Sequence, residues 1–201
     1  VAIVDSPQPN AFATGRNEKN AVIAVTTGLL ATMNDNELMG VLGHETGHIV
    51  HHDILIATLA ASIATAISYL GYMVEFALLF GGFGGSGKRE GEAFGLLGAT
   101  LLAPVAALFI QMAISRSREY YADEASAKLT GRPDFLISAL TKIEAYIRAG
   151  VPMKANPSTS SLWIANPFRG GLTNLLSTHP STPARIARLK KIAREMGLYL
   201  E

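Results

Sequence analysis

The pentapeptide His44-Glu45-Thr46-Gly47-His48 decides how this chain is organised. Residues four apart on an α-helix lie one turn apart on the same face, so both imidazoles can reach one metal ion. The glutamate between them can act on a water molecule at that metal. This HExxH pattern is typical of zinc peptidases. A catalytic zinc site has three protein ligands, so a third remains to be found.

A capping box predicts where the helix that carries the motif begins. The side chain of Asn34 can cap the first turn, and the side chain of Glu37, three residues later, can accept a hydrogen bond from the backbone of Asn34. The preceding residues favour a small β element, because residues 1–4 and 21–25 are short apolar runs rich in β-branched side chains. Turn residues separate these runs. A short helix is expected at residues 26–33.

Composition favours a membrane protein over a soluble one. Charged residues make up only 16% of the chain, against about 25% in an ordinary soluble domain. Hydrophobic residues make up 49%, and the mean hydropathy is +0.26. The net charge of +1 gives no argument for nucleic acid as a partner. The chain has no cysteine, which excludes disulfides, a thiol nucleophile and a Cys-type zinc site.

Two long apolar stretches follow the motif, at residues 54–80 and 93–115. The first contains one charge, Glu75, and the second contains none; each exceeds the roughly 20 residues that span a bilayer. A glycine-rich, charged loop at residues 81–92 lies between them and is flexible by composition. The pattern predicts a transmembrane helical hairpin over residues 54–115. The alternative is a buried hairpin of a soluble protein, but the chain offers little other mass to bury it.

The residues directly after the motif do not supply the third metal ligand. A metzincin would place a histidine ten residues after His44, but that position is Ile54. His51 lies two turns from His44, about 10 Å along the helix axis, which is too far to share one metal. We expect His51, His52 and Asp53 to mark the membrane interface instead.

Glu119 is the better candidate for the third ligand. Glu119 and Asp123 are four residues apart and share one face of a helix. Glu119 can then bind the metal, while Asp123 accepts the second N–H of a ligand histidine. A hairpin would return Glu119 to the level of the motif, because it lies just after the second apolar stretch. The alternative is a solvated carboxylate beside Arg116 and Arg118.

The rest of the chain is expected to be helical with one irregular segment. A break at residues 131–133 separates two helices, the second running over residues 134–148. Residues 150–178 are rich in proline, asparagine and serine and favour an irregular segment. Thr182 and Pro183 are a good N-cap and first-turn pair for a last helix. Its basic residues form a solvated face, or one that lies against anionic lipid.

Several motifs together resemble the HtpX family of membrane-integrated heat-shock zinc metalloproteases, whose wider relatives include the CAAX prenyl protease. They are the HETGH pentapeptide, the apolar hairpin and the segment SRSREYYAD at residues 115–123. The likeness extends to NAFATG at residues 10–15 and to THP at residues 178–180 followed by Arg185. It covers nearly the whole chain.

The resemblance implies a role for each matching residue. His44, His48 and Glu119 correspond to the ligands of one zinc ion per chain, with Asp123 behind them, and Glu45 corresponds to the general base.

Two later residues, His179 and Arg185, correspond to a pair that stabilises the tetrahedral intermediate. Without the resemblance, the first would be a helix-entry histidine packed beside a proline, and the second a surface arginine. The resemblance also implies that an extended substrate pairs along Asn10, Ala11, Phe12 and Ala13. From the residues alone, this segment could equally be only a turn.

The expected fold is mainly α with a small β-sheet, an α+β arrangement. In it, a zincin-like gluzincin catalytic domain is interrupted by the transmembrane hairpin. Residues 1–53 form the first part of the catalytic domain, residues 54–115 the hairpin, and residues 116–201 the second part. The resemblance also implies two further membrane helices before Val1.

The expected function is that of a zinc-dependent endopeptidase in a lipid bilayer. The resemblance implies polypeptide substrates, namely misfolded or damaged membrane proteins, and the cell membrane of a bacterium or archaeon. A small excess of positive charge after the second apolar stretch places the active site on the cytoplasmic side. The sequence names neither the natural substrates nor the oligomeric state.

Two non-proteolytic classes compete with this interpretation. Glu45 and His48 also form an ExxH pair, as in di-iron helix bundles of the membrane, but such a site needs a second ExxH. None occurs in this sequence. A membrane scaffold with a structural zinc ion has no use for a base at Glu45.

Overall fold

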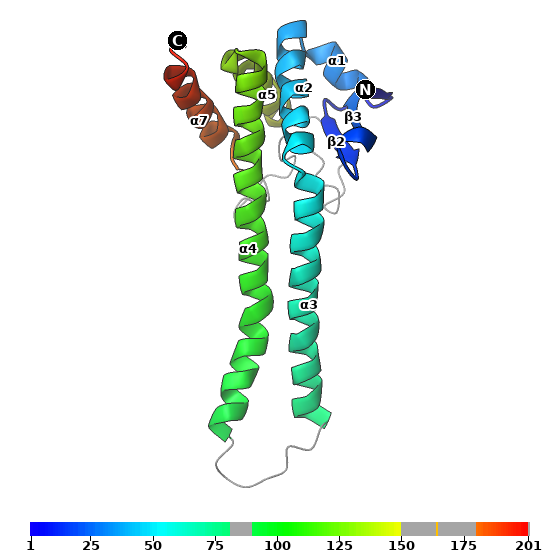
Figure 1. The fold of residues 1–201 in the computed structure, drawn as a ribbon, viewed down its shortest axis with the longest axis vertical. Coiled ribbons are helices and arrows are strands. Elements are labelled where there is room, and N and C mark those ends of the chain that lie inside the picture. Colours follow the sequence, from blue (N-terminus) through cyan, green and yellow to red (C-terminus); the bar gives the residue numbers. More distant parts are fainter. Residues whose placement is uncertain (81–89, 150–163, 165–179, 201) are drawn as a thin grey trace. The chain divides into compact units, whose positions relative to one another are not determined.

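The computed structural model describes residues 1–80, 90–149, 164 and 180–200. It divides into two compact units, of which the first joins Val1–Leu55 to Ser115–Glu201 and the second is Ile56–Ile114. Figure 1 shows the elements of each unit. Most of the predicted glycine-rich loop and of the predicted irregular segment lies outside the described residues.

A three-stranded sheet lies at the start of the first unit. It is built from β1 (Ala2–Val4), β2 (Ala11–Gly15) and β3 (Ala21–Thr26), in the order β1-β3-β2. β1 runs parallel to β3, and β2 runs antiparallel to it, with Phe12 opposite Ala24. The interpretation of residues 10–15 as only a turn is therefore wrong, because β2 is a strand at the sheet edge.

The motif helix begins where the capping box predicts. After the short helix α1 (Thr27–Thr32), α2 (Asp35–Val50) is capped by Asn34. The Asn34 side chain accepts from the backbone of Glu37 at 2.9 Å, and the Glu37 carboxylate accepts from the backbone of Asn34 at 2.9 Å. Burial would raise the pKa of Glu37, but an ion pair with Lys142 at 2.7 Å outweighs it and the pKa is lowered.

Three further helices belong to the described part of the first unit. They are the last part of α4 (Glu90–Thr130), α5 (Pro133–Arg148) and α7 (Thr182–Glu195). The predicted break between α4 and α5 is confirmed. The cap of α7 differs from the prediction, because the side chain of Ser181 and not Thr182 accepts from the first turn.

Two apolar clusters hold the first unit together. One joins the sheet and α1 to α2 and α5, with α2 also lying beside β2 (Figure 1). Its buried members are Ala11, Val25, Leu29, Met33, Val41, Ala139, Ile143, Ile147 and Ile164. The other joins α4, α5 and α7 and consists of Ala127, Leu136, Leu140, Leu189 and Ile192. The motif helix thus packs on both the sheet and α5, which fixes its position.

Glycines on α2 let its neighbours approach closely. A Cβ added at Gly40 would lie 2.6 Å from the backbone nitrogen of Leu136 on α5. A Cβ at Gly43 would lie 3.1 Å from the hydroxyl of Ser126 on α4. That hydroxyl donates to the backbone carbonyl of Gly40 at 2.7 Å. α2 is therefore in near-backbone contact with both helices.

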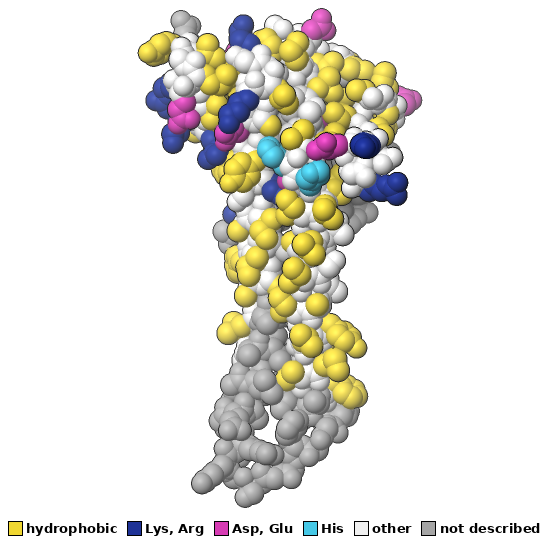
Figure 2. All heavy atoms as spheres, viewed as in Figure 1, with side chains coloured by type: hydrophobic (Ala, Val, Ile, Leu, Met, Phe, Trp, Pro, Cys, Tyr) yellow, Lys and Arg dark blue, Asp and Glu magenta, His cyan; other side chains and the backbone are white. Residues whose placement is uncertain are grey.

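The second unit contains α3 (Asp53–Phe80) from Ile56 onward and α4 up to Ile114. Among the described residues, one helical window, Asp53–Val74, is long and apolar enough to cross a membrane, and apart from Asp53 its residues are half-buried or exposed. The amide of Gln111 on α4 donates to the carbonyl of Ala60 on α3 at 3.4 Å, so the two helices are in contact. Figure 2 shows apolar side chains gathered over this unit. Exposed members include Leu59, Ile63, Tyr69, Leu70, Met73, Leu102, Val105, Leu108, Phe109 and Ile110.

Replacing Gly40 tests the close packing of α2. Alanine is intrinsically the better helix former, by about 1 kcal/mol, but here its methyl group would meet the backbone of α5. We expect Gly40→Ala to lower the free energy of unfolding by about 1–3 kcal/mol net, measured by chemical denaturation in detergent. Asn36→Ala, at an exposed position of α2, is the control. A Gly40→Ala protein as stable as the control would contradict the close packing.

Candidate metal centre

Three side chains converge at the C-terminal half of α2. The Nε2 atoms of His44 and His48 lie 3.1 Å apart. The two carboxylate oxygens of Glu119, on α4, lie 3.6 Å from these nitrogens, one from each. One ligand atom from each residue falls within 4.8 Å of the others. The structure thus brings together the three residues that the sequence nominates as metal ligands.

These separations match the size of a small tetrahedral cation. Zinc binds histidine nitrogen at about 2.0–2.1 Å, so two ligands of a tetrahedral ion lie about 3.3 Å apart. The observed separations of 3.1 and 3.6 Å lie on either side of this value. Two imidazole nitrogens and one carboxylate are also the donor set of a catalytic zinc site. The residues present therefore fit the metal that the motif predicts.

Asp123 holds the ring of His44. Its Oδ1 lies 3.0 Å from the Nδ1 of His44, and its side chain is completely buried. Burial would raise the pKa of Asp123, but the charge of Arg185 and the hydrogen bond from His44 outweigh it, so the pKa is lowered. The ionised carboxylate favours the proton of His44 on Nδ1, which leaves the Nε2 lone pair facing His48 and Glu119.

Arg185 lies behind this pair and not at the surface. Only 1% of its side chain is exposed, so its interpretation as a surface arginine is wrong. It donates to both oxygens of Asp123, at 2.9 and 2.6 Å, and to the carbonyl of Ile164 at 2.7 Å. Its Nη1 lies 3.3 Å from Glu119 Oε2, and its Nη2 lies 3.3 Å from both ring nitrogens of His44. Burial acts to lower the pKa of Arg185, but the charges of Asp123 and Glu119 outweigh it and raise the pKa.

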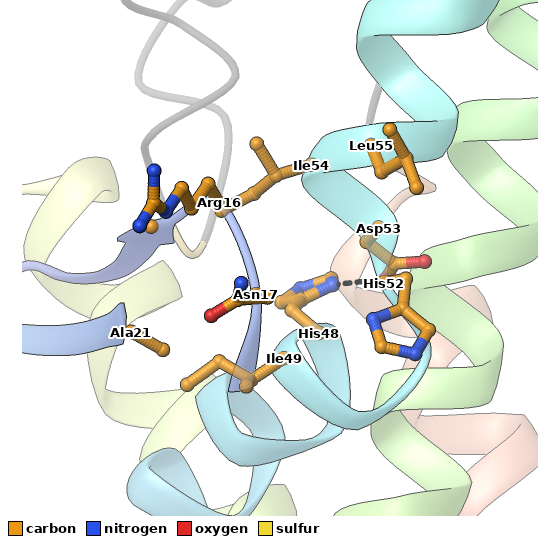
Figure 3. A pocket seen from close by; sticks show the side chains of 10 residues that line it. Arg16, Asn17, Ala21, His48, Ile49, His52, Asp53, Ile54 and Leu55 are labelled. Carbon is orange, nitrogen blue, oxygen red and sulfur yellow. Dashed lines mark hydrogen bonds and ion pairs between the residues drawn. The ribbon is translucent and has the colours of Figure 1, made fainter. Parts of the chain in front are cut away.

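Asp53 is a site residue that the sequence analysis assigned to the membrane interface. It is buried, and its Oδ2 lies 2.6 Å from the Nδ1 of His48 (Figure 3). On an unbroken helix, residues five apart point about 140° away from each other. The helix breaks at His51 and His52, however, and α3 begins at Asp53. Helical periodicity could not reveal this contact; the proximity of an aspartate to the motif was the one available signal.

Glu45 is buried beside His44 on α2. Its charge is among those that raise the pKa values of His48 and Arg185, so it belongs to the same electrostatic cluster.

Gly47, within the motif, lets α2 pack closely against α4. A Cβ there would lie 2.9 Å from the Cα of Ala122 and from the Cβ of Ala125, both on α4. The motif therefore meets α4 closely, one turn from Glu119.

The residues nominated for substrate binding lie on or next to the edge strand β2. Asn10 and Ala11 are buried, while Phe12 and Ala13 are half-buried. The side chain of Asn10 accepts from the backbone of Ile164 at 3.2 Å. Strand β2 itself lies beside α2. His179, the other nominated residue, lies outside the described residues.

A small pocket opens beside His48 (Figure 3). It lies between the end of β2, the turn that follows and the start of α3. Figure 3 shows the hydrogen bond between His48 and Asp53 as a dashed line, and it also draws Arg16 and Asn17 from the turn. The lining residues are Gly15, Arg16, Asn17, Ala21, His48, Ile49, His52, Asp53, Ile54 and Leu55.

Comparison with known proteins gives concordant results. Residues 1–193 match peptidase family M48. A protease HtpX homolog from Thermococcus kodakarensis is 52% identical over 200 residues, covering 99% of this chain and 69% of that protein. One from Aquifex aeolicus is 50% identical over 202 residues, covering 98% and 67%. The crystal structure of S. mikatae Ste24p shares the fold, with a TM-score of 0.55 and 24% sequence identity, over 93% of this chain and 44% of that chain.

Protons and Zn²⁺ would compete for His48, so the affinity for Zn²⁺ should depend on pH. Burial lowers the pKa of His48, but the hydrogen bond to Asp53 and the charges of Glu119 and Glu45 outweigh it and raise the pKa to about 9. Zn²⁺ must displace that proton. We therefore expect the affinity of the metal-free protein for Zn²⁺ to rise about tenfold per pH unit between pH 7 and 8.5.

The measurement is a competition titration of the metal-free protein against a chromophoric chelator at several pH values. A histidine with an ordinary pKa of 6.5 would be deprotonated over this range. An affinity that is constant above pH 7 would therefore contradict the raised pKa.

Proposed function

Since the chain belongs to peptidase family M48 and is a metalloprotease, we propose that it is a membrane-bound zinc endopeptidase. In this proposal His44, His48 and Glu119 hold one zinc ion. The observation that carries it is the mutual separation of their ligand atoms, 3.1 and 3.6 Å, which suits a tetrahedral ion. Support comes from Asp123 and Asp53, which each hold the outer nitrogen of one histidine.

Glu45 is the proposed general base. The bound metal would supply Lewis-acid chemistry, polarising the scissile carbonyl and making a water molecule more acidic. The carboxylate of Glu45 takes a proton from the attacking water and then delivers it to the leaving amine nitrogen. Burial of Glu45 within the helix pair excludes bulk water, which strengthens its electrostatic interactions with the reacting groups.

His179 and Arg185 are the proposed source of positive charge for the developing oxyanion. Asp123, Glu119 and the carbonyl of Ile164 together contact all three nitrogens of the Arg185 guanidinium. We therefore propose that Arg185 acts through the electrostatic effect of its positive charge and by holding these carboxylates in position. Direct donation to the oxyanion is assigned to His179.

The proposed substrate is an extended polypeptide that pairs along β2 at Asn10, Ala11, Phe12 and Ala13. Support comes from the position of β2 at the sheet edge, beside the motif helix. An unpaired strand edge presents backbone donors and acceptors that an extended chain can match.

The proposed setting is the cell membrane of a bacterium or archaeon, with the active site on the cytoplasmic side. The apolar window that could cross a membrane begins at Asp53, the residue that holds His48. Residues 54–115 would form a transmembrane hairpin inserted between the two parts of the gluzincin domain, residues 1–53 and 116–201. A metal centre so close to a membrane helix favours substrates that are themselves in the bilayer, such as damaged membrane proteins.

Replacing the general base separates metal binding from catalysis. We expect Glu45→Gln to retain one zinc ion per chain and to lose at least about 100-fold in the rate of casein cleavage. The amide cannot accept the proton, although its size is unchanged. Metal analysis and a cleavage assay in detergent measure the two effects. Glu195→Gln, an exposed carboxylate on α7, is the matched control. A Glu45→Gln enzyme with normal activity would refute the assignment.

Removing the third ligand should abolish metal binding. We expect purified Glu119→Ala to contain far less than one zinc ion per chain. A catalytic zinc site needs three protein ligands, and this variant would keep only two histidines. Glu124→Ala is the control, since Glu124 lies on the same helix and forms an ion pair with Lys128 at 2.7 Å. Full occupancy in the Glu119→Ala protein would show that the third ligand lies elsewhere.

A further inference from the structure

We propose that Asp53 is a positioning residue of the metal centre, acting through His48. The inference rests on the proposed function, since it assumes that His48 binds the metal. In this proposal Asp53 fixes the tautomer and the ring orientation of His48. Asp123 does the same for His44, so each ligand histidine has its own carboxylate.

The hydrogen bond between His48 and Asp53 is the first observation. Its length of 2.6 Å is that of a short, charge-assisted bond. It engages Nδ1, so Nε2 is left facing His44 and Glu119. A carboxylate on the outer nitrogen raises the basicity of a metal-ligating histidine and fixes its rotation.

The burial of Asp53 is the second observation. Only 6% of the residue is exposed, and its Oδ1 has no hydrogen-bond partner among the described residues. Burying a carboxylate with one oxygen unsatisfied is unfavourable, and such groups in native structures call for an explanation. The contact with His48 is the compensating interaction that the described residues provide. This pattern suits a residue kept for its effect on the metal centre.

The backbone conformation that delivers Asp53 is the third observation. α2 ends at Val50, and the backbone of His51 then donates to the carbonyl of Gly47 at 3.0 Å. His52 has a φ of 53°, the left-handed region that favours glycine. This single residue turns the chain so that Asp53 points back to His48 (Figure 3). Without the left-handed residue, a continuing helix would carry the aspartate to another face.

A contact from α4 secures this turn. The guanidinium of Arg118 donates to the backbone carbonyl of Asp53. Arg118 directly precedes Glu119, so one short segment of α4 supplies both a metal ligand and the hydrogen bond that holds the turn. The position of Asp53 is therefore tied to the position of the third ligand.

A simpler role for Asp53 would be to stabilise the first turn of α3, where acidic residues are favourable. The variant Asp53→Ser separates the two roles. Serine is a good residue at a helix start, but it is too short to reach His48. Asp35→Ser, at the exposed first turn of α2, is the matched control for loss of an acidic residue at a helix start.

The experiment measures zinc affinity by chelator competition and the thermal unfolding of the metal-free protein, both in detergent. We expect Asp53→Ser to bind zinc about 10–100-fold more weakly than the wild type, with the same unfolding temperature as Asp35→Ser. Asp53→Asn, which keeps an acceptor but no charge, should recover part of the loss. Zinc affinity in Asp53→Ser equal to that of Asp35→Ser would overturn the proposal.

Two further variants keep the test decisive. If Asp53→Ser does not fold, the isosteric Asp53→Asn replaces it, and wild-type affinity in that variant overturns the proposal. His52→Gly should retain wild-type zinc affinity, whereas His52→Val, which disfavours positive φ, should lose several-fold. Failure of the proposed function is distinguishable, because the wild-type protein itself would then bind no zinc.

Discussion

The buried ion pair between Asp123 and Arg185 joins the helices on which the metal centre depends. Asp123 comes from α4 and Arg185 from α7, and both contact His44 on α2. Removing one partner of a buried pair typically costs about 3–5 kcal/mol, because an uncompensated charge is left behind. The pair therefore supports the ligand histidine only while all three helices are in place. The candidate metal centre and the packing of the three helices therefore share this contact.

Close packing brings α2 and α4 near enough for their ligands to meet. Gly43 and Gly47 have no side chains, so Ser126 and Ala122 of α4 lie close to their backbones. Glu119 then reaches both histidines from the neighbouring turn. The small residue within the motif is thus part of the geometry of the site, although it has no ligand atom.

The junction between α2 and α3 links the metal centre to the apolar part of the chain. Asp53 is at once the first residue of the apolar window and the partner of His48. The two histidines of the candidate metal centre are supported differently as a result. His44 is held by a fully buried, charge-compensated pair, whereas His48 is partly exposed and held by a carboxylate on a turn. In this member of peptidase family M48, the proposed support of His48 therefore comes from the first residue of a helix that is long and apolar enough to cross a membrane.

The sequence by itself determined the features that depend on residues close together in the chain. The capping box of Asn34 and Glu37 predicted the start of the motif helix, and helical spacing placed Glu119 and Asp123 on one face. Tertiary structure decided the rest. The pairing of β2 as an edge strand and the burial of Arg185 depend on contacts between residues far apart in the chain. The contact of Asp53 with His48 depends on one left-handed residue that interrupts the helix, so helical periodicity pointed to another face.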